Sequence, residues 1–381
     1  MSELAPVVRT ELPDGLTAWV ITRYSEGKQT LADGRLVKDL RALDSGDRER
    51  IPRFAEDVWS VCGRHMLNSD GADHARLRSV VVPYLSPTAI SQVEPVVESL
   101  AEALLESMKV GRAAELMSGY AQPLTESVLA HVLGISDPLM RQAATLTREL
   151  GGRENPETAR MRSAYSDLLD FTRDLILQLR GKDPAQTIVS ALAQGVDKGE
   201  ITLREMSSTI LMLMGAGISS TAIAIGHNAA VLMQSRDLIA ALSKDRIRAA
   251  SLIDELLRLH PPFAFSPWRY AREPLEIAGA TIPAGAIVFV LLAAANRDPT
   301  VYNGTESQVS DRSKHLTFGF GTHYCVGASL ARMEISTALR TLFAELPDIR
   351  LRVPYDEVRW HGLLFDRAPT AIPVYTGALE H

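Results

Sequence analysis

The segment 318–327, which reads Phe-Gly-Phe-Gly-Thr-His-Tyr-Cys-Val-Gly, holds the densest group of residues that could do chemistry. Its glycines free the backbone for positive φ angles and for close approach to a flat ligand. They also leave amide N–H groups uncovered, which can point at the sulfur of Cys325. A helix is predicted to begin just after this cysteine, and its positive end favours a thiolate there. Such a thiolate would be a good soft ligand for iron.

Other uses of Cys325 stay open on the residues alone. A lone cysteine is most often a small, buried apolar residue. A zinc site would need four ligands, and Cys62 and Cys325, which are far apart in the sequence, supply few of them. A cysteine nucleophile with a histidine base is also conceivable, although His323, two residues before the cysteine, is awkwardly placed.

The segment resembles the heme-ligand loop F-x-x-G-x-x-x-C-x-G of the cytochrome P-450 superfamily, the heme-thiolate monooxygenases, and of its soluble bacterial members in particular. The resemblance implies that Cys325 is the axial iron ligand of heme b (iron protoporphyrin IX), with Phe318 and Gly319 beside the cofactor. A thiolate ligand would push electron density onto the iron and favour O–O bond cleavage. The similarity extends over nearly the whole chain, from Val20 to Val374.

Heme b carries two propionate groups, so its pocket needs cations. His74 and Arg78 lie four residues apart and would share one helix face, as in the H-x-x-x-R motif of the family. Arg269 matches the family's arginine at the start of a strand beside the heme, and His323 matches a further propionate donor. The resemblance assigns these four residues to the cofactor, whereas Arg76 is expected to be a solvated charge.

Glu255 and Arg258 are three residues apart on a predicted helix, which by itself is an ordinary surface ion pair worth a few tenths of a kcal/mol. Because Pro261 and Pro262 follow and the cysteine lies downstream, the pair resembles the E-x-x-R motif of the family. In that motif the pair is structural and locks the core on the thiolate side. The usual P-x-R-F pattern is missing before Phe318, which leaves the third partner of the pair unassigned.

The helix predicted over 202–235 carries Ala216-Gly217-Ile218-Ser219-Ser220. Glycine within a helix costs about 1 kcal/mol relative to alanine, so something must need the room. A serine hydroxyl there can bond to the carbonyl one turn back and bend the helix. The segment resembles the oxygen-binding motif A-G-x-[DE]-T-[TS] of the family. Ala216 and Gly217 match it, but Ser219 stands at the acid position and Ser220 replaces the threonine.

This departure affects proton delivery, because splitting bound dioxygen needs two protons. The segment has no carboxyl group to collect a proton from bulk water. We expect protons to come through water held by Ser219 and Ser220, or from a polar group of the substrate.

Substrate contacts can be placed only by the topology of the family. The candidates are apolar with few charges, which indicates a medium-sized organic substrate of aromatic or alicyclic character. Plain core packing is the alternative for about half of them. They are Trp59, Met66, Met214, Ile218, Phe263, Phe265 and Leu364.

A largely helical frame must position these residues. Apolar residues at helical spacing predict helices over 84–110, 112–135, 137–150, 156–182, 184–196, 202–235, 236–259 and 328–346. Thr202 and Glu205 form a capping box at the start of the longest one. Strands are predicted over 17–21, 275–277, 280–283 and 287–292. We expect a mainly α fold with a small β lobe, as one heme-thiolate domain over residues 1–381 with a β-rich N-terminal lobe, an α-rich core and a shortened N-terminus.

The 381 residues are 46% hydrophobic and 23% charged, with a net charge of −6. This mildly acidic balance argues against a non-specific nucleic-acid binder. The apolar runs 210–218 and 286–295 are shorter than the roughly 20 residues that span a bilayer, and no signal peptide is recognisable. With two cysteines, we expect a reduced, cytoplasmic protein that binds neither nucleic acid nor membrane.

The expected activity is hydroxylation or another oxidation of an organic molecule in secondary-metabolite biosynthesis. Electrons must come from outside, since no flavin or nicotinamide domain fits beside a heme domain of this length. A ferredoxin with its ferredoxin reductase is the expected donor, and Arg76, Lys314, Arg332 and Arg340 could form its docking face. Three alternatives stay open: oxidative C–C or C–O coupling without oxygen insertion, a non-catalytic binding protein, and a Cys–His hydrolase without heme.

Overall fold

The structure, a computed structural model, describes residues 4–12, 15–49, 64–109, 113–150, 166–167, 170–171, 173–177, 187–302, 315–362 and 368–377. Trp59, Cys62, Lys314 and Leu364 lie outside these residues, as does most of the helix expected over 156–182.

Helices dominate the described chain. They are α1 (Tyr24–Ala32), α2 (Ser45–Glu49), α4 (Gly71–Val81), α5 (Pro87–Ser91), α6 (Glu94–Lys109), α7 (Gln122–Leu133), α8 (Asp137–Leu150), α10 (Ile188–Asp197), α11 (Leu203–Leu232), α12 (Arg236–Lys244), α13 (Arg246–Leu259), α14 (Leu292–Ala295) and α15 (Ala328–Glu345). Short turns of 3₁₀ or π type are η1 (Leu40–Ala42), η3 (Val82–Leu85), η4 (Met117–Ala121), η6 (Gly321–His323) and η7 (Tyr355–Glu357).

The strands are short and mostly paired within small sheets. They are β1 (Val7–Glu11), β2 (Thr17–Ile21), β3 (Leu36–Val37), β4 (Ala113–Glu115), β5 (Arg269–Ala271), β6 (Leu275–Ile277), β7 (Ala280–Ile282), β8 (Ile287–Val290), β9 (Arg350–Leu351), β10 (Trp360–His361), β11 (Ala368–Pro369) and β12 (Pro373–Tyr375).

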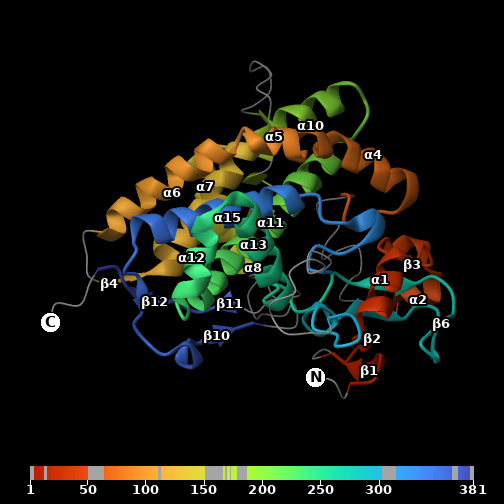
Figure 1. The fold of residues 1–381 in the computed structure, drawn as a ribbon. Helices are drawn as coiled ribbons and strands as arrows, with labels where there is room; N and C mark the ends of the chain where they lie inside the picture. Colours follow the sequence, from red (N-terminus) through yellow and green to blue (C-terminus); the bar gives the residue numbers. More distant parts are fainter. Residues whose placement is uncertain are drawn as a thin grey trace.

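The 30-residue helix α11 runs through the middle of the helical part and contacts α7, α8, α10, α12 and α15 (Figure 1). The predicted capping box is confirmed: Glu205 N donates to the Thr202 hydroxyl at 3.1 Å, and Thr202 N donates to Glu205 Oε2 at 2.8 Å. The helix is long and apolar enough to cross a membrane, but 61% of its most apolar window is buried inside the protein. It is the central helix of the main hydrophobic core.

The small β lobe is built on a five-stranded sheet in the order β1-β2-β8-β5-β3. Strand β2 pairs with β1 antiparallel and with β8 in parallel, so that Ile21 lies opposite Val290. All residues of β5 and β8 are buried, and the lobe has two apolar clusters of its own. Figure 1 shows this sheet beside α1, at the end of the molecule where the chain begins. The expected mainly α fold with a small β lobe is confirmed.

Several predicted helices are interrupted. Asp245 has extended backbone and separates α12 from α13, whose start it caps by accepting a hydrogen bond from Arg248 N at 2.7 Å. The helix expected over 112–135 begins instead as β4, which pairs with β12 near the C-terminus. The one expected over 84–110 is divided into η3, α5 and α6. Pairing with a distant strand is not visible in local periodicity, which explains the error at β4.

Candidate functional site

The segment 315–327, named the cysteine loop, leads into α15. Gly319 and Gly321 have φ angles of 74° and 76°, in the left-handed region that favours glycine. A Cβ on Gly321 would lie 3.1 Å from the carbonyl oxygen of Leu31, so this glycine also lets the loop approach α1. The amide of Cys325 donates to the carbonyl of Phe318 at 2.9 Å and closes the loop.

Cys325 lies at the N-terminal end of α15, whose cap residue is Gly327. Burial raises the pKa of the thiol, while the nearby Gly327 amide and the charges of Arg78 and Arg332 lower it. The cysteine side chain is nonetheless accessible. The Gly327 amide is thus close to the sulfur, as the sequence predicts for an amide of this loop.

Arg332, one of the residues expected on a docking face, supports the cysteine loop. Its guanidinium lies 4.3 Å from the centroid of the Phe318 ring. It donates to the Tyr324 hydroxyl at 3.0 Å and to Asp254 Oδ1 at 2.7 Å. Asp254 also lies 3.4 Å from Nε2 of His315. These contacts tie both ends of the loop to α13.

Glu255 and Arg258 form a buried ion pair on α13 and not a surface pair. Nη2 and Nε of Arg258 donate to the two carboxylate oxygens at 2.6 and 2.7 Å, and the side chains of Arg258 and Glu255 are 9% and 15% exposed. The guanidinium also donates to the carbonyl of Asn296 and stacks 4.4 Å from the centroid of the Tyr302 ring. Asn296 Oδ1 accepts from Leu316 N at 2.7 Å. Asn296 is therefore a third partner, and it connects the pair to the cysteine loop.

Three of the predicted cofactor residues lie close together: His74 on α4, His323 in the cysteine loop and Arg269 on β5. The rings of His74 and His323 are 4.3 Å apart between centroids, and His323 Nε2 lies 3.2 Å from Asp70 Oδ1. Burial lowers the pKa of His74 to about 4 and that of Arg269 to about 10. Nε2 of His74 and Nε of Arg269 are buried without a hydrogen-bond partner. The group therefore has N–H capacity that the described protein does not use.

The remaining donors of the predicted cofactor residues bind the backbone. Arg269 donates to the carbonyls of Leu36 and Leu31 at 3.1 and 2.9 Å. Arg78 donates to the carbonyl of Tyr324 at 2.8 Å, and so holds the cysteine loop to α4. Sequence reasoning missed Lys38, which is 3% exposed and joins the same group. Its one visible signal is a lysine directly after the apolar pair of β3.

The middle of α11 exposes one row of side chains, which we call the open strip. Ala216 and Ser219 are exposed within a helix that is otherwise largely buried, and their neighbours at helical spacing are half-buried. Residues three and four apart share one helix face. The open strip consists of Met212, Gly215, Ala216, Ser219 and Ser220.

The two serines of the open strip differ in their bonding. The Ser220 hydroxyl donates to the carbonyl of Ala216 at 2.7 Å, the predicted bond to the preceding turn. Ser219 has no side-chain partner in the described part of the chain. The absence of a side chain at Gly217 also serves packing, because a Cβ there would lie 3.0 Å from Cδ2 of Leu129 on α7. Gly217 therefore allows helix packing.

Three of the predicted substrate contacts are buried in the main core. Met214 and Ile218 are 0% and 5% exposed within the main core, off the open strip, so the packing alternative holds for them. Met66, at 4% exposed, packs in the same core. Phe263 is half-buried, and so is Phe265, whose ring meets that of Phe289 edge-on with centroids 6.2 Å apart.

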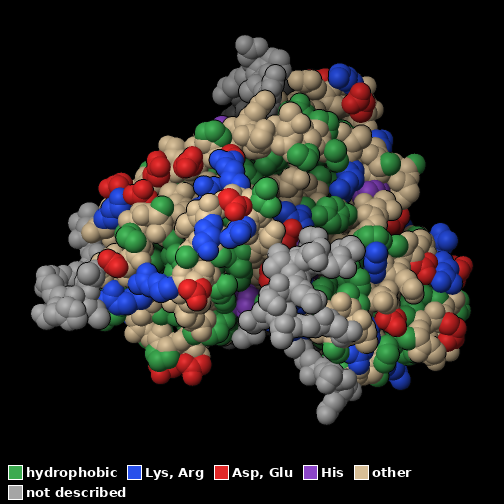
Figure 2. Space-filling view, viewed as in Figure 1, with side chains coloured by type: hydrophobic (Ala, Val, Ile, Leu, Met, Phe, Trp, Pro, Cys, Tyr) green, Lys and Arg blue, Asp and Glu red, His purple; other side chains and the backbone are tan. Residues whose placement is uncertain are grey.

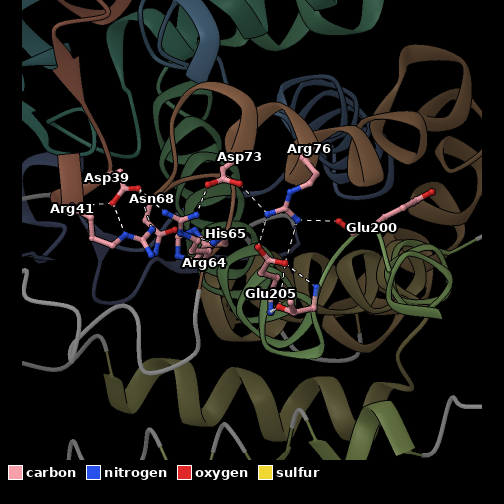
Figure 3. A network of polar contacts seen from close by, with 10 residues as sticks. Asp39, Arg41, Arg64, His65, Asn68, Asp73, Arg76, Glu200 and Glu205 are labelled. Atoms are coloured by element: carbon pink, nitrogen blue, oxygen red, sulfur yellow. Dashed lines mark hydrogen bonds and ion pairs between the residues drawn. The ribbon is translucent and has the colours of Figure 1, made fainter. Parts of the chain in front are cut away.

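Arg76, expected to be a solvated charge, keeps 36% of its side chain exposed but is held in ion pairs. Its guanidinium donates to the two oxygens of Glu205 at 2.6 and 3.2 Å and to Asp73 at 3.1 Å. Figure 3 shows the network continuing through Asp73 and Arg64 to Asp39. The network ties α4 to the start of α11 and to the β lobe, and its carboxylates neutralise much of the charge that Arg76 could offer to a partner.

These observations fit an iron heme. The accessible sulfur of Cys325 meets an amide N–H and a helix N-terminus, which suit an anionic iron ligand. The buried group of cations and unpartnered N–H atoms suits carboxylates. The open strip leaves mostly small side chains uncovered in the middle of α11.

Known proteins resemble the chain over nearly its whole length. A model of the cytochrome P450 family matches residues 155–346. The polyketide biosynthesis cytochrome P450 PksS of Bacillus subtilis is 31% identical, over 98% of this chain and 93% of that protein. The structure of myxobacterial cytochrome P450 CYP267B1 with myristic acid has a TM-score of 0.91 at 29% identity, over 98% of this chain and 94% of that one. The structure of CxnD, a cytochrome P450 for C–S bond formation in chuangxinmycin biosynthesis, has a TM-score of 0.88 at 26% identity. The match covers 98% of this chain and 91% of that one.

The family match, the relative aligned over almost the entire chain and the shared fold agree with the cysteine loop, the buried Glu255–Arg258 pair and the open strip. The chain therefore belongs to the cytochrome P450 family and is an oxygen-dependent oxidoreductase with an iron heme cofactor.

Proposed function

We propose that this cytochrome P450 inserts one oxygen atom from O2 into a medium-sized organic molecule in the biosynthesis of a secondary metabolite. The observation that carries the proposal is the open strip of α11, in which small residues and an unpartnered hydroxyl lie exposed on a buried helix. The relation to a polyketide biosynthesis enzyme supports the biosynthetic role. The proposal treats residues 1–381 as one heme-thiolate domain that works in the cytoplasm.

The cofactor we propose is heme b, with Cys325 as its axial ligand. When bound, the heme iron supplies the dioxygen chemistry. The Gly327 amide and the N-terminus of α15 stabilise negative charge at the sulfur. Phe318 and Gly319 shape the loop around it, and His74, Arg78, Arg269 and His323 face the cofactor carboxylates.

Proton delivery falls to Ser219 in this proposal. The Ser220 hydroxyl donates its proton to the carbonyl of Ala216, so its oxygen can accept but its proton is engaged. The exposed Ser219 hydroxyl can both donate and accept, and it can hold a water molecule in the oxygen site formed by Ala216 and Gly217. Since the open strip has no carboxyl group, protons reach it through water or from a polar group of the substrate.

The substrate pocket is proposed to be mainly apolar. Phe263 and Phe265 keep part of their rings accessible and are retained as substrate contacts. The predicted contacts of Trp59 and Leu364, which lie outside the described residues, remain proposals. An apolar pocket with few polar groups binds a substrate by burial and orients it through those few groups.

A second reaction fits the same residues, namely oxidative coupling without oxygen insertion. The observation that favours it is the absence of an acid at Ser219, since coupling tolerates altered proton delivery better than hydroxylation does. The similar fold of CxnD, which serves C–S bond formation, supports this alternative.

The electron donor we propose is a ferredoxin with its reductase, docking beside the cysteine loop. Phe320 and Tyr324 are 38% and 37% exposed there, and Lys28 Nζ lies 4.7 Å from the centroid of the Phe320 ring. The half-buried Arg340 lies on α15. Over the face drawn in Figure 2, acidic and basic side chains are interspersed, so the proposal relies on the cysteine loop and not on a broad basic field.

Labelled dioxygen tests the proposed reaction. Candidate substrates are first found by the change of heme spin state that they induce, and each is then turned over with a ferredoxin system under ¹⁸O2. One labelled oxygen atom in the product, with reductant use that depends on substrate, is the expected result. An unlabelled product that has gained a C–C, C–O or C–S bond would contradict oxygen insertion and support oxidative coupling.

A further inference from the structure

Lys38 is a buried ammonium group that the protein leaves short of partners. It follows β3 and is 3% exposed. Its Nζ donates to the carbonyl of Trp268 at 2.6 Å and lies 5.6 Å from the centroid of the Trp268 ring. An ammonium has three N–H donors, and in the described part of the chain Nζ makes no other hydrogen bond.

The surroundings of Lys38 carry an excess of positive charge. Lys38, Arg78 and Arg269 belong to the group around His74 and His323, in which Asp70 is the carboxylate in contact. Asp70 is already engaged: Oδ2 accepts from the amides of Lys38 and Asp39, each at 2.8 Å, and Oδ1 faces His323. Asp33, which also acts on Arg269, is paired with Arg35 at 2.6 Å. With both histidines neutral, an excess of two positive charges remains.

Unpartnered atoms in the same group point independently to a missing acceptor. Nε2 of His74 and Nε of Arg269 are buried and have no hydrogen bond. Burial lowers the pKa of Lys38 well below its ordinary value, with the charge of Arg269 acting in the same direction. A ligand with two carboxylates would supply both the acceptor oxygens and the charge that the group lacks.

We propose that Lys38 is a further ligand of the heme propionates, so that bound heme, and not the polypeptide, neutralises its charge. The inference rests on the proposed heme b cofactor, whose two carboxylates match the excess of two positive charges. His74 and Arg78 reach the cofactor from α4, whereas Lys38 belongs to the β lobe. Its contact therefore fastens that lobe to the heme.

This role has opposite consequences for the two forms of the protein. Without heme, Lys38 is a buried charge that the polypeptide compensates only in part, so Lys38→Met should leave the melting temperature of the apoprotein unchanged or raise it. With heme, the same substitution should release the cofactor to excess apomyoglobin roughly ten to a hundred times faster, the range expected for one lost hydrogen bond between charged groups. A lysine that merely holds the Trp268 carbonyl would destabilise both forms alike.

The decisive comparison uses heme b and its dimethyl ester, in which the propionates are uncharged, in the full-length protein. Lys38→Met should accelerate loss of heme b but change loss of the ester less than twofold, and it should lower the heme reduction potential. Lys38→Arg, which keeps the charge, should retain heme b, and the exposed Lys244→Met should behave as wild type in every measurement.

Equal acceleration for heme b and the ester would overturn the assignment of Lys38. So would an apoprotein that Lys38→Met destabilises as much as the holoenzyme. If the cofactor extracted from the wild-type protein is not heme b by mass spectrometry, the proposed cofactor fails and the Lys38 assignment fails with it. Heme b that is retained unchanged by Lys38→Met overturns the Lys38 assignment alone.

Discussion

The hydroxyl of Ser220 donates to the carbonyl oxygen of Ala216, one turn earlier on α11, at 2.7 Å. Its proton is therefore engaged by the helix itself, while Ser219, at the neighbouring exposed position, has a hydroxyl that no described residue binds. Two adjacent serines that look equivalent in the sequence are thus distinguished by their hydrogen bonds.

Ser219→Ala should lower the coupling of reductant use to product about tenfold, while Ser220→Ala should change it less than about twofold. General acids contribute more than this, but water can partly replace a lost hydroxyl. The measurement is product formed per reductant consumed, with peroxide release followed in parallel. Each variant serves as the control for the other. A larger loss of coupling in Ser220→Ala than in Ser219→Ala would contradict the assignment of proton delivery to Ser219.

Glu255→Gln should destabilise the holoenzyme by about 3–5 kcal/mol, because it leaves the buried guanidinium of Arg258 without its counter-charge. Unfolding by denaturant, together with heme content, checks this. Arg248→Gln is the matched control, since Arg248 and the cap residue Asp245 form an exposed pair at the same spacing at the start of the same helix. It should cost less than about 1 kcal/mol. An equal loss of unfolding free energy in Glu255→Gln and Arg248→Gln would show that the Glu255–Arg258 pair stabilises the fold no more than a surface pair does.

Glu334 on α15 gives the protein a pH-dependent stability. Burial raises its pKa to about 8, partly offset by the nearby Thr125 hydroxyl, whereas a glutamate in the unfolded chain has a pKa of about 4.3. Between these values the folded state holds a proton that the unfolded state releases. Stability must therefore fall as the pH rises, by up to about 1.4 kcal/mol per pH unit.

Glu334→Gln removes this dependence, so the free energy of unfolding of the variant should gain on the wild type steadily from pH 5 to pH 8. Denaturant unfolding at several pH values measures the difference. Glu345→Gln, at the half-buried C-terminal end of the same helix, should run parallel to the wild type. A difference between Glu334→Gln and wild type that stays constant with pH would show that Glu334 titrates normally.

Electron transfer should depend on the surface beside the cysteine loop. Lys28→Gln should slow reduction by ferredoxin about two- to fivefold at low salt, because a charge at the rim of an interface acts mainly on association. The difference should shrink at high ionic strength, where exposed charges are screened. Stopped-flow reduction rates measure it, with Lys244→Gln as the control. A reduction rate that is insensitive to salt in the wild type and in both variants would contradict docking beside the cysteine loop.

The sequence predicted the elements of the fold best where the pattern is local. The capping box at Thr202, the strand Thr17–Ile21 and the bend of the cysteine loop all follow from residues close together in the chain. The strand β4 does not, because it exists only through its partner β12. The cap at Asp245 was missed because the apolar spacing runs on across it.

The placement of the candidate residues was predictable wherever a short motif fixes the spacing, as for Cys325, His74–Arg78 and Glu255–Arg258. Which face of α11 is open was not, because Met214 and Ile218 are as apolar as Met212 on the open strip and only packing separates them. The ion pairing of Arg76 was missed since its partner Glu205 lies on another helix. Lys38 was missed for a similar reason, as its group assembles from α4, β5 and the cysteine loop.

The absorption spectrum of the reduced, CO-bound holoenzyme tests the central claim, that the thiolate of Cys325 holds the heme iron. Wild-type protein should show the red-shifted Soret band from which the family takes its name. Cys325→His should bind heme, held by its remaining ligands, but give the short-wavelength band of a neutral axial ligand. A red-shifted band that persists in Cys325→His, or that is absent from correctly folded wild-type holoenzyme, would contradict the account.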